Sequence, residues 1–560
     1  MHCFNIKLPF FIVFLVLLQC LWCLASPSKT SDNPTLEIPS YVAGRTVDSI
    51  VVDNRNIFDP DDPKFQHFIF RLANKLHYKT RKETIRQEML FNVEKPFSIE
   101  LAEETERNLR NNLQLYDAWI KTDTLSNGHL LVRVVTIDEW SLAMEPNYSF
   151  EDNENRFELT VSDRNLFGRN KFLSLGYTFQ NYDGDFFRSQ YTDPRLFGRS
   201  IGFETKYSDN PAGRLKMLTV YRPFYNLKQK TTWNISWLSN KNRQDIYNNS
   251  TLIGRSESKI ENIALEFGSR FGSYRHKFMF DGEYTYKDKG ALDTVMFNDN
   301  QSDCKWVAVE MPHDSIFHTI GVGATMAHLD FAKLRQIDGI RYTEDFTLGQ
   351  KVALSISRAF QPGFHDYVWD KMEMQIAQGY QFGHNLAYIS LSRNMWIQSG
   401  GDLRRLTNLT LYYYSFPLDF VTFACHGNYL SDWRSNSADG VSLGGINGIR
   451  GYDKHFKTGD RKAVFNAEFR FFPKIDILSA MFSPTVFVDG GRTWKSDSKL
   501  NWKDFYFSGG IGLRAGIGHS SRNRIARIDI AYSEYNGWQF SVGIKQYFEV
   551  RETSLLLTTH

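Results

Sequence analysis

The run Gly444-Gly445-Ile446-Asn447-Gly448-Ile449-Arg450-Gly451-Tyr452 decides how this chain is interpreted, because of the strands that follow it. Those strands alternate apolar and polar residues almost to the C-terminus, and two of them carry a carboxylate, Glu468 and Asp489. Alternate residues of a strand share one face, so both carboxylates are expected on the same side of a sheet. A loop arginine facing two inward carboxylates can hold a loop inside a barrel. We therefore predict that Arg450 pairs with Glu468, Asp489 or both.

Other interpretations of these residues are weaker. A phosphate-binding loop would end in Gly-Lys-Ser/Thr and open a helix, and neither follows Gly451. Without Arg450, the run would be an ordinary flexible loop, and Glu468 and Asp489 would be solvated charges in a pore. A carboxylate pair is also typical of glycosidases, but nothing in the sequence supplies a sugar-binding cleft.

The rest of the sequence gives no sign of covalent chemistry. The 14 histidines show no metal-ligand spacing, and no Gly-x-Ser-x-Gly motif is present. We therefore expect no enzyme, no metal and no cofactor.

The composition excludes some classes of protein. The chain has 560 residues, with 66 Lys and Arg against 63 Asp and Glu, which is not the concentrated basic excess of a nucleic-acid binder. It is rich in aromatics, with 45 Phe, 27 Tyr and 12 Trp, as expected where aromatic girdles flank a membrane band.

The first 25 residues predict a secretory signal peptide. Lys7 supplies the positive charge, Pro9 to Leu24 form an apolar core, and Ala25 ends the segment. A lipoprotein would use Cys20 or Cys23, but the residues before them are large; an uncleaved anchor is a further minority alternative. After Ala25 no stretch reaches the roughly 18 apolar residues of a membrane helix, which argues against a helical membrane protein.

Two cysteines remain after this segment, Cys304 and Cys425. They lie far apart in the sequence and form no metal-ligand or redox motif. We interpret them as unpaired or buried thiols.

Residues 26–43 predict a flexible lead, and residues 44–140 a small domain of order β-α-α-β-β. The expected strands are Val47–Val52, one that includes Tyr116 to Ile120, and Leu130–Val135, with the hairpin turn Asn127-Gly128 before the last.

The expected helices of this domain run from about Thr80 to Leu90, and onward from Ser98, which is a plausible N-cap. Residues 60–79, including the stretch Leu72 to His77, look like an insertion without an assigned role. His77 and His129 are expected on the surface of this domain.

From about Trp140 helical periodicity disappears, and residues 141–548 predict a transmembrane antiparallel β-barrel, followed by a tail, 549–560. Similar turns, 163–169 and 193–199, end two early strands. Segmentation by alternation gives five strands after Tyr452 and as many as 15 before it. Some of the 15 could be hairpins outside the wall, so 16 strands are taken as nominal and 18 or 20 stay open.

The constellation of Arg450, Glu468 and Asp489 resembles the BamA/TamA-like outer-membrane assembly superfamily, which includes the two-partner secretion exporters. In that family a long loop ends in Val/Ile-Arg-Gly-Phe/Tyr, folds into the barrel and meets acidic residues on the following strands. The N-terminal order resembles a single POTRA domain, the periplasmic module of the family. The two turns at 163–169 and 193–199 also resemble this family, whose barrels usually have 16 strands.

The resemblance implies a bacterial outer-membrane protein, in a Gram-negative envelope, with its N-terminal domain in the periplasm. The first barrel strand, roughly Leu142 to Phe150, and the last, roughly Trp538 to Phe548, would form a seam that opens sideways. The seam residues singled out in the last strand are Gly543, Tyr547 and Phe548. Gly543 would weaken the seam, or else only relieve crowding in the lumen.

The implied function is the insertion or export of client proteins. The implied partners are the bilayer, unfolded clients and accessory periplasmic proteins, and no nucleic acid. The alternatives are a two-partner-secretion-type exporter, or a passive pore or structural surface antigen. An exporter usually carries two periplasmic modules and a plug helix, whereas this sequence predicts one module and a short, polar lead.

Overall fold

The protein is described by a computed structural model. Its described residues are 38–151, 154–180, 184–210, 213–248, 251–296, 315–340, 342–363, 367–383, 385–398, 401–434, 441–445, 448–453, 456–473, 476–477, 480–517 and 525–550. The expected signal peptide, residues 26–37 of the expected lead, residues 551–560 of the expected tail, and Cys304 lie outside the described residues.

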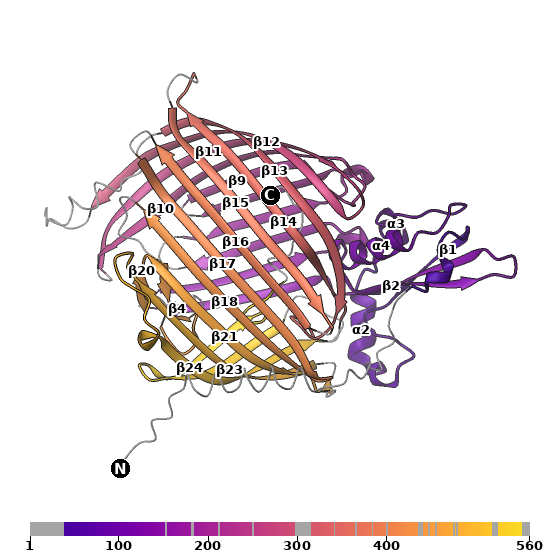
Figure 1. The fold of residues 1–560 in the computed structure, drawn as a ribbon. Coiled ribbons are helices and arrows are strands. Elements are labelled where there is room, and N and C mark those ends of the chain that lie inside the picture. Colours follow the sequence, from indigo (N-terminus) through magenta and orange to yellow (C-terminus); the bar gives the residue numbers. More distant parts are fainter. Residues whose placement is uncertain are drawn as a thin grey trace, which may run out of the picture.

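An N-terminal domain is built from a three-stranded sheet and short helices (Figure 1). Its strands are β1 (Val47–Arg55), β2 (Leu115–Thr124) and β3 (Leu130–Asp138), and its helices are η1 (Ser40–Val42), η2 (Pro63–Phe65), α2 (Phe68–Leu76), α3 (Lys82–Gln87) and α4 (Ile99–Asn112). The sheet order is β1-β3-β2, with β3 parallel to β1 and antiparallel to β2. Val47, Ile85 and Leu109 are fully buried in one cluster that joins α3 and α4 to the sheet.

Local sequence signals explain these elements. Ser98 caps α4 by accepting a hydrogen bond from the Leu101 N–H at 3.4 Å. Gly128 takes a φ of +81° in the turn between β2 and β3, a conformation that favours glycine. The insertion that the sequence left without a role contains α2.

The expectation that His77 lies on the surface is wrong, whereas His129 does lie at the surface. The His77 side chain is 2 % exposed, and its Nε2 lies 3.4 Å from Asp138 Oδ2. Its ring stacks on Trp140, which immediately precedes the barrel. The reason is that α2 brings His77 back to the end of β3, where the domain joins the barrel, and no local pattern in the sequence reveals that return.

The remainder of the described chain forms an antiparallel β-barrel, whose strands cross the view obliquely in Figure 1. The strands are β4 (Leu142–Glu151), β5 (Glu154–Asp163), β6 (Phe172–Gln180), β7 (Phe186–Asp193), β8 (Gly202–Asn210), β9 (Gly213–Arg222), β10 (Thr231–Asn248), β11 (Thr251–Phe271), β12 (His276–Met296), β13 (Ser315–Leu334), β14 (Glu344–Phe360), β15 (Tyr367–Phe382), β16 (Asn385–Gln398), β17 (Gly401–Leu418), β18 (Val421–Arg434), β21 (Arg461–Phe471), β22 (Asp476–Ile477), β23 (Ala480–Trp494), β24 (Tyr506–Ile517), β25 (Ile525–Ser533) and β26 (Gly537–Ile544). The strand order returns to its start, with β9 next to β10 and β26 next to β4.

The barrel fold is confirmed, but the nominal count of 16 strands is too low. Twenty of the described strands in the barrel have eight or more residues, and β22 has two. Fifteen precede the loop that carries Arg450 and five follow it, as segmentation by alternation indicates. The strands that the sequence left open as hairpins outside the wall belong to the wall.

The outward face of the wall is apolar and the inward face is polar. Along β25 exposed and buried residues alternate: Ile528, Ile530 and Tyr532 are exposed, whereas Arg527 and Asp529 are buried. Similar outward rows of exposed apolar side chains are Ile263, Leu265 and Phe267 on β11, and Ile320 and Val322 on β13. None of the described helices is long and apolar enough to cross a bilayer.

The N-terminal domain is fixed to one end of the barrel, which we call the domain end. There the turn at 163–169 contacts the start of α3. Gly168 O accepts hydrogen bonds from Arg81 N at 2.9 Å and from Thr84 Oγ1 at 3.1 Å. A Cβ at Gly168 would lie 2.2 Å from Lys79 O, so this close approach requires glycine. Phe167 and Phe197 occupy the same position in the two turns, with φ of 54° and 53°.

Acidic and basic side chains on α4, and Glu88 at the end of α3, reach further turns and strand ends at the domain end. The contacts are Glu88–Arg195 at 2.6 Å, Glu104–Tyr274 at 2.8 Å, Glu106–Lys333 at 2.5 Å and Arg110–Asp345 at 2.6 Å. Burial lowers the pKa of Arg110, but the Asp345 carboxylate outweighs it, and the pKa lies above its usual value. The paired charges therefore hold the domain against the barrel.

The last strand is shorter than expected. β26 ends at Ile544, and Lys545 takes a φ of +72°, which turns the chain into the lumen. Tyr547 and Phe548, which were expected in the last strand, therefore lie outside β26. Phe548 is buried among Tyr414, Leu386 and other lumen-facing side chains.

Candidate functional site

The loop between β18 and β21 brings Arg450 into the barrel, supported by the glycines around it. Gly448 and Gly451 have φ of +138° and +79°, and a Cβ at Gly448 would lie 2.7 Å from Val464 Cγ2. Ser533 Oγ donates a hydrogen bond to Gly451 O at 2.6 Å. Glycine is therefore needed at both positions, for the backbone conformation and for close packing on the wall.

Arg450 is 2 % exposed and binds both carboxylates named from the sequence. Its Nε and Nη2 donate to the two oxygens of Asp489, each at 2.7 Å, and its Nη1 donates to Glu468 Oε1 at 2.6 Å. Its backbone N–H also donates to Asp489 Oδ2 at 3.0 Å. This bidentate geometry is specific to a guanidinium, because an ammonium cannot reproduce the planar fork.

Two aromatic rings enclose the Arg450 guanidinium. Its Cζ lies 3.5 Å from the ring centre of Phe487 and 4.1 Å from that of Tyr547. Tyr547 OH donates to Gly445 O at 2.7 Å, so the C-terminal tail binds the same loop. Tyr547 thus contributes to the arginine site rather than to the seam.

Ile449 and Tyr452 anchor the loop on either side of this arginine. Ile449 is fully buried with Leu443 and Val464. Tyr452 OH donates a hydrogen bond to Phe507 O at 2.9 Å. The loop is therefore held by apolar packing as well as by charge.

A second layer of charges was missed by the sequence analysis. Arg470 Nε lies 2.8 Å from Glu468 Oε2, and Arg514 pairs with both Glu468 and Asp529. Arg450 Nη1 also lies 3.7 Å from Asp529 Oδ2. The alternation already places Arg470 on the face of Glu468, and Asp529 on the inward face of its strand, so these two could have been found.

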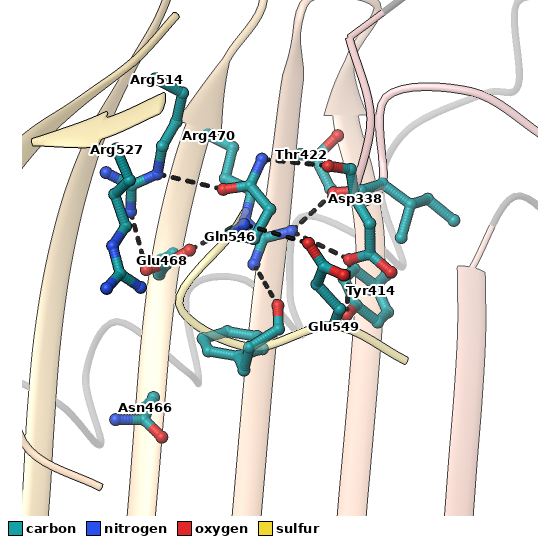
Figure 2. Close-up of polar contacts among 12 residues, drawn as sticks. Asp338, Tyr414, Thr422, Asn466, Glu468, Arg470, Arg514, Arg527, Gln546 and Glu549 are labelled. Atoms are coloured by element: carbon teal, nitrogen blue, oxygen red, sulfur yellow. Dashed lines mark hydrogen bonds and ion pairs between the residues drawn. The ribbon is translucent and has the colours of Figure 1, made fainter. Parts of the chain in front are cut away.

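Segments from the domain end complete the network, as Figure 2 shows around Arg470. Arg470 Nη1 lies 3.3 Å from Asp338 Oδ1, and its Nη2 donates to Phe548 O at 3.0 Å. Val550 N donates to Asp338 Oδ2 at 3.1 Å, and Arg514 Nε donates to Gln546 Oε1 at 3.0 Å. Asp338 lies in the turn between β13 and β14, and nothing in the sequence near it predicts this contact.

The network is nearly neutral and fully inside the wall. Four arginines face four carboxylates: Arg450, Arg470, Arg514 and Arg527 against Asp338, Glu468, Asp489 and Asp529. Each of the carboxylates has a cationic partner, so the set is suited to fixing a loop and a tail in one position. Within the described residues no group of side chains could hold a metal ion.

Gly543 makes room for one of these arginines. A Cβ at this position would lie 2.6 Å from Arg527 Nη2, which is the far end of a flexible side chain. Of the two roles considered from the sequence, relief of crowding in the lumen is the one that this contact supports.

Outward side chains at the seam between β26 and β4 are more exposed than those on the adjacent strands β25 and β5. The outward side chains Trp538, Phe540, Val542 and Ile544 of β26 are 63–71 % exposed, against 40–51 % for Ile528, Ile530 and Tyr532 on β25. Met144 on β4 is 69 % exposed, against 36 % for its partner Val161 on β5. Side chains on both sides of the seam therefore have fewer neighbours than those one strand away.

Comparison with known proteins finds no matching protein-family model and no matching curated protein. Among solved structures, BamA from Haemophilus ducreyi lacking POTRA domains 1–3 aligns with a TM-score of 0.38 at 12 % identity, over 89 % of this chain and 83 % of that one. CdiB from Acinetobacter baumannii aligns at 0.40 and 12 %, over 90 % and 74 %. CdiB from Escherichia coli aligns at 0.40 and 10 %, over 93 % and 91 %.

These likenesses are all to β-barrels of low identity. The siderophore receptor PirA from Pseudomonas aeruginosa also aligns, with a TM-score of 0.35 at 10 % identity, over 75 % of this chain and 82 % of that one. All four TM-scores are below 0.5, and the identities are 10–12 %.

Proposed function

We propose that this chain is a bacterial outer-membrane assembly and translocation factor, which inserts or exports unfolded client proteins through the seam between β26 and β4. Its partners are the outer-membrane bilayer and the clients, and its N-terminal domain lies in the periplasm. The low coverage of the seam side chains is the observation that carries the proposal. Side chains with few neighbours across the seam contribute little to holding its two strands together, and an opened seam offers an edge to an incoming strand.

The membrane location is supported by the outer surface of the wall. Soluble proteins rarely expose contiguous apolar patches larger than a few hundred Å², whereas rows such as Ile263, Leu265 and Phe267 recur on strand after strand. Apolar-out, polar-in alternation on antiparallel strands is the pattern of an outer-membrane barrel.

The network of charges around Arg450 supports an assembly role over a passive pore. Arg450 and its partners hold a loop from one end of the barrel against a tail and a turn from the other end. A wide passive pore gains nothing from such a network. A barrel whose seam opens needs another element to keep its shape, and the network joins β21, β23, β24 and β25 next to the seam.

The N-terminal domain offers a second place for a client. β2 is an edge of its sheet, and Lys121, Asp123 and Thr124 in its outer half are exposed. An extended segment can add to such an edge by main-chain hydrogen bonds. This placement puts a client strand next to the domain end of the barrel.

The proposal is tested by reconstituting the full chain in phospholipid vesicles and adding a urea-unfolded eight-stranded outer-membrane barrel as a probe client. Folding of the client is followed on a gel with unheated samples, in which the folded barrel migrates faster than the unfolded chain. We expect faster folding than in empty vesicles. No acceleration, together with a steady large conductance in a planar bilayer, would support a passive pore instead.

A further inference from the structure

Helix α2 exposes an apolar stripe that nothing in the described chain covers. Phe68, Ile69, Leu72 and Leu76 are 62 %, 52 %, 46 % and 60 % exposed. Their spacing places them on one side of the helix, since residues three and four apart are neighbours. Four large apolar side chains on one face of nine residues are the mark of an interaction surface.

The opposite side of α2 already has its packing partners. Phe70 is buried with Ile57 and Phe58. Asn74 Nδ2 donates a hydrogen bond to Phe58 O at 2.8 Å, and its Oδ1 accepts one from Phe58 N at 3.2 Å. These contacts fix the orientation of α2, so the helix cannot rotate to bury the exposed stripe without losing them.

The segment around the stripe is strongly basic. Between His67 and Lys82 the sequence has five basic residues and no acidic one. These basic residues are Arg71, Lys75, Lys79, Arg81 and Lys82. Arg71 and Lys75 are exposed on α2 itself.

The stripe also continues toward the barrel. Tyr78, just beyond α2, is 62 % exposed, and its ring packs edge-on against Phe167 at 5.9 Å. Phe167 is 56 % exposed in the turn that joins β5 to β6. Figure 1 draws α2 close to the strand ends, on the other side of β2 from α3 and α4. The exposed apolar surface thus runs from α2 to the strands next to the seam.

We propose that α2 is an interfacial membrane helix, which inserts its stripe into the phospholipid leaflet at the domain end of the barrel, beside β5 and β6. Basic side chains on α2 bind the phosphates of anionic lipids, and the apolar side chains lie among the acyl chains. This inference rests on the proposed membrane location of the barrel. The continuity with the barrel surface and the positive charge favour lipid over a protein partner.

The test places a nitroxide spin label on α2 in the full chain. Cys304 is replaced by Ser and Cys425 by Ala, and a single cysteine is introduced by Leu72→Cys or, in a second variant, Leu76→Cys. Each labelled protein is reconstituted in vesicles of phosphatidylethanolamine and phosphatidylglycerol. Collision rates with oxygen, which partitions into bilayers, and with a water-soluble nickel chelate are then measured.

Two further positions serve as controls. Leu265→Cys places the label on the outward face of β11, and Val51→Cys places it on β1, which Figure 1 draws away from the barrel. We expect labels at 72 and 76 to gain oxygen collisions and lose nickel collisions relative to the label at 51. We also expect the gain to be smaller in vesicles that lack phosphatidylglycerol.

The outcomes separate the two proposals. If the label at 265 reports the bilayer and those at 72 and 76 behave like the label at 51, the interfacial helix is wrong and the membrane location stands. If the label at 265 does not report the bilayer, the membrane location itself is wrong. Spin–spin broadening between labels at 72 would show a second copy on the stripe and would also overturn the proposal.

Discussion

At the scale of single residues, Arg450 concentrates the constraints that hold the luminal loop. Its guanidinium binds Asp489 through two nitrogens and Glu468 through a third, between the rings of Phe487 and Tyr547. Removal of one partner from a buried ion pair leaves an uncompensated charge, whereas an exposed ion pair contributes little.

We therefore expect Arg450→Ala to lower the free energy of unfolding by about 3–5 kcal/mol, because buried Asp489 loses its arginine partner and Glu468 keeps only Arg470 and Arg514. Arg450→Lys should recover only part of this loss, because an ammonium cannot bind Asp489 with two nitrogens. The measurement is urea unfolding in detergent micelles, followed by tryptophan fluorescence.

The matched control is Arg275→Ala. Arg275 pairs with Asp330 at 2.7 Å, but both side chains are about half exposed, so its loss should cost about 0–1 kcal/mol. Equal losses for Arg450→Ala and Arg275→Ala would mean that the luminal network does not contribute specifically to stability.

Glu549, beyond the last strand, gives the tail a dependence on pH. Burial, and then the Asp338 carboxylate, raise the pKa of Glu549 to about 7. A raised pKa means that the tail binds in the lumen more favourably while the Glu549 carboxyl is neutral. The contribution of Glu549 to the stability of the bound tail is therefore fully present below the unfolded pKa of about 4.3, and it is lost as pH rises through about 7.

We expect trypsin to cleave after Lys545 increasingly from pH 5.5 to 8.5, because ionised Glu549 disfavours the docked tail. The Glu549→Gln variant, measured at the same pH values, corrects for the pH dependence of trypsin and should show no such increase. The same pH response in both proteins would rule out Glu549 as the cause.

The sequence predicts part of this site and not the rest, for a physical reason. Arg450, Glu468 and Asp489 lie within 40 residues, on a loop and on strands whose alternation sets the direction of each side chain. Asp338 reaches the same network from more than 100 residues away. A contact of that range depends on how the barrel closes, which no local pattern encodes.

At the scale of elements, the end of β26 shows where alternation fails as a guide. Apolar and polar residues alternate from Trp538 to Ile544, and Tyr547 and Phe548 extend an apolar pattern that favours a longer strand. The chain instead turns at Lys545, because Arg470 and Asp338 bind the backbone of the tail inside the lumen. An apolar residue of the tail that is buried in the lumen cannot be distinguished by sequence from an apolar residue of a wall strand.

The contact of α4 with the barrel is expected to slow hydrogen exchange in one turn at the domain end. Arg110→Ala removes the bidentate contact to Asp345, and we expect faster hydrogen exchange in the turn between β13 and β14, because Asp345 loses the two hydrogen bonds that tie this end of β14 to α4. Mass spectrometry of the exchanged full chain measures this.

Arg133→Ala is the control within the same domain. Arg133 lies 3.9 Å from Asp123, and their side chains are 41 % and 60 % exposed, so exchange in the barrel turn should not change. If Arg110→Ala also leaves the turn unchanged, the domain is held by its other contacts, such as those of Glu88 and Glu106.

At the scale of the whole molecule, the strand count shows the value of the sequence pattern over analogy. Alternation gives as many as 15 strands before the loop and five after it, and the described wall has 15 and five strands of eight or more residues. The lower nominal count came from the family that the sequence resembles. The direction of each side chain also decides which positions can be crosslinked across the seam. Met144 and Pro146 of β4 face outward, whereas Ser541 and Gly543 of β26 face inward, so a disulfide to either of these two needs an inward position of β4.

A disulfide across the seam between β4 and β26 shows whether the protein works by opening there. Cysteines at inward positions of β4 and β26 are paired in turn, Ala143→Cys or Glu145→Cys with Ser541→Cys or Gly543→Cys, after replacement of Cys304 and Cys425. A disulfide forms only where the Cα atoms lie within about 7 Å, so bond formation identifies the register. In vesicles, we predict that the oxidised protein no longer accelerates folding of the probe client and that a reductant restores the acceleration. Full acceleration by a protein whose seam is completely crosslinked would show that clients do not pass through the seam.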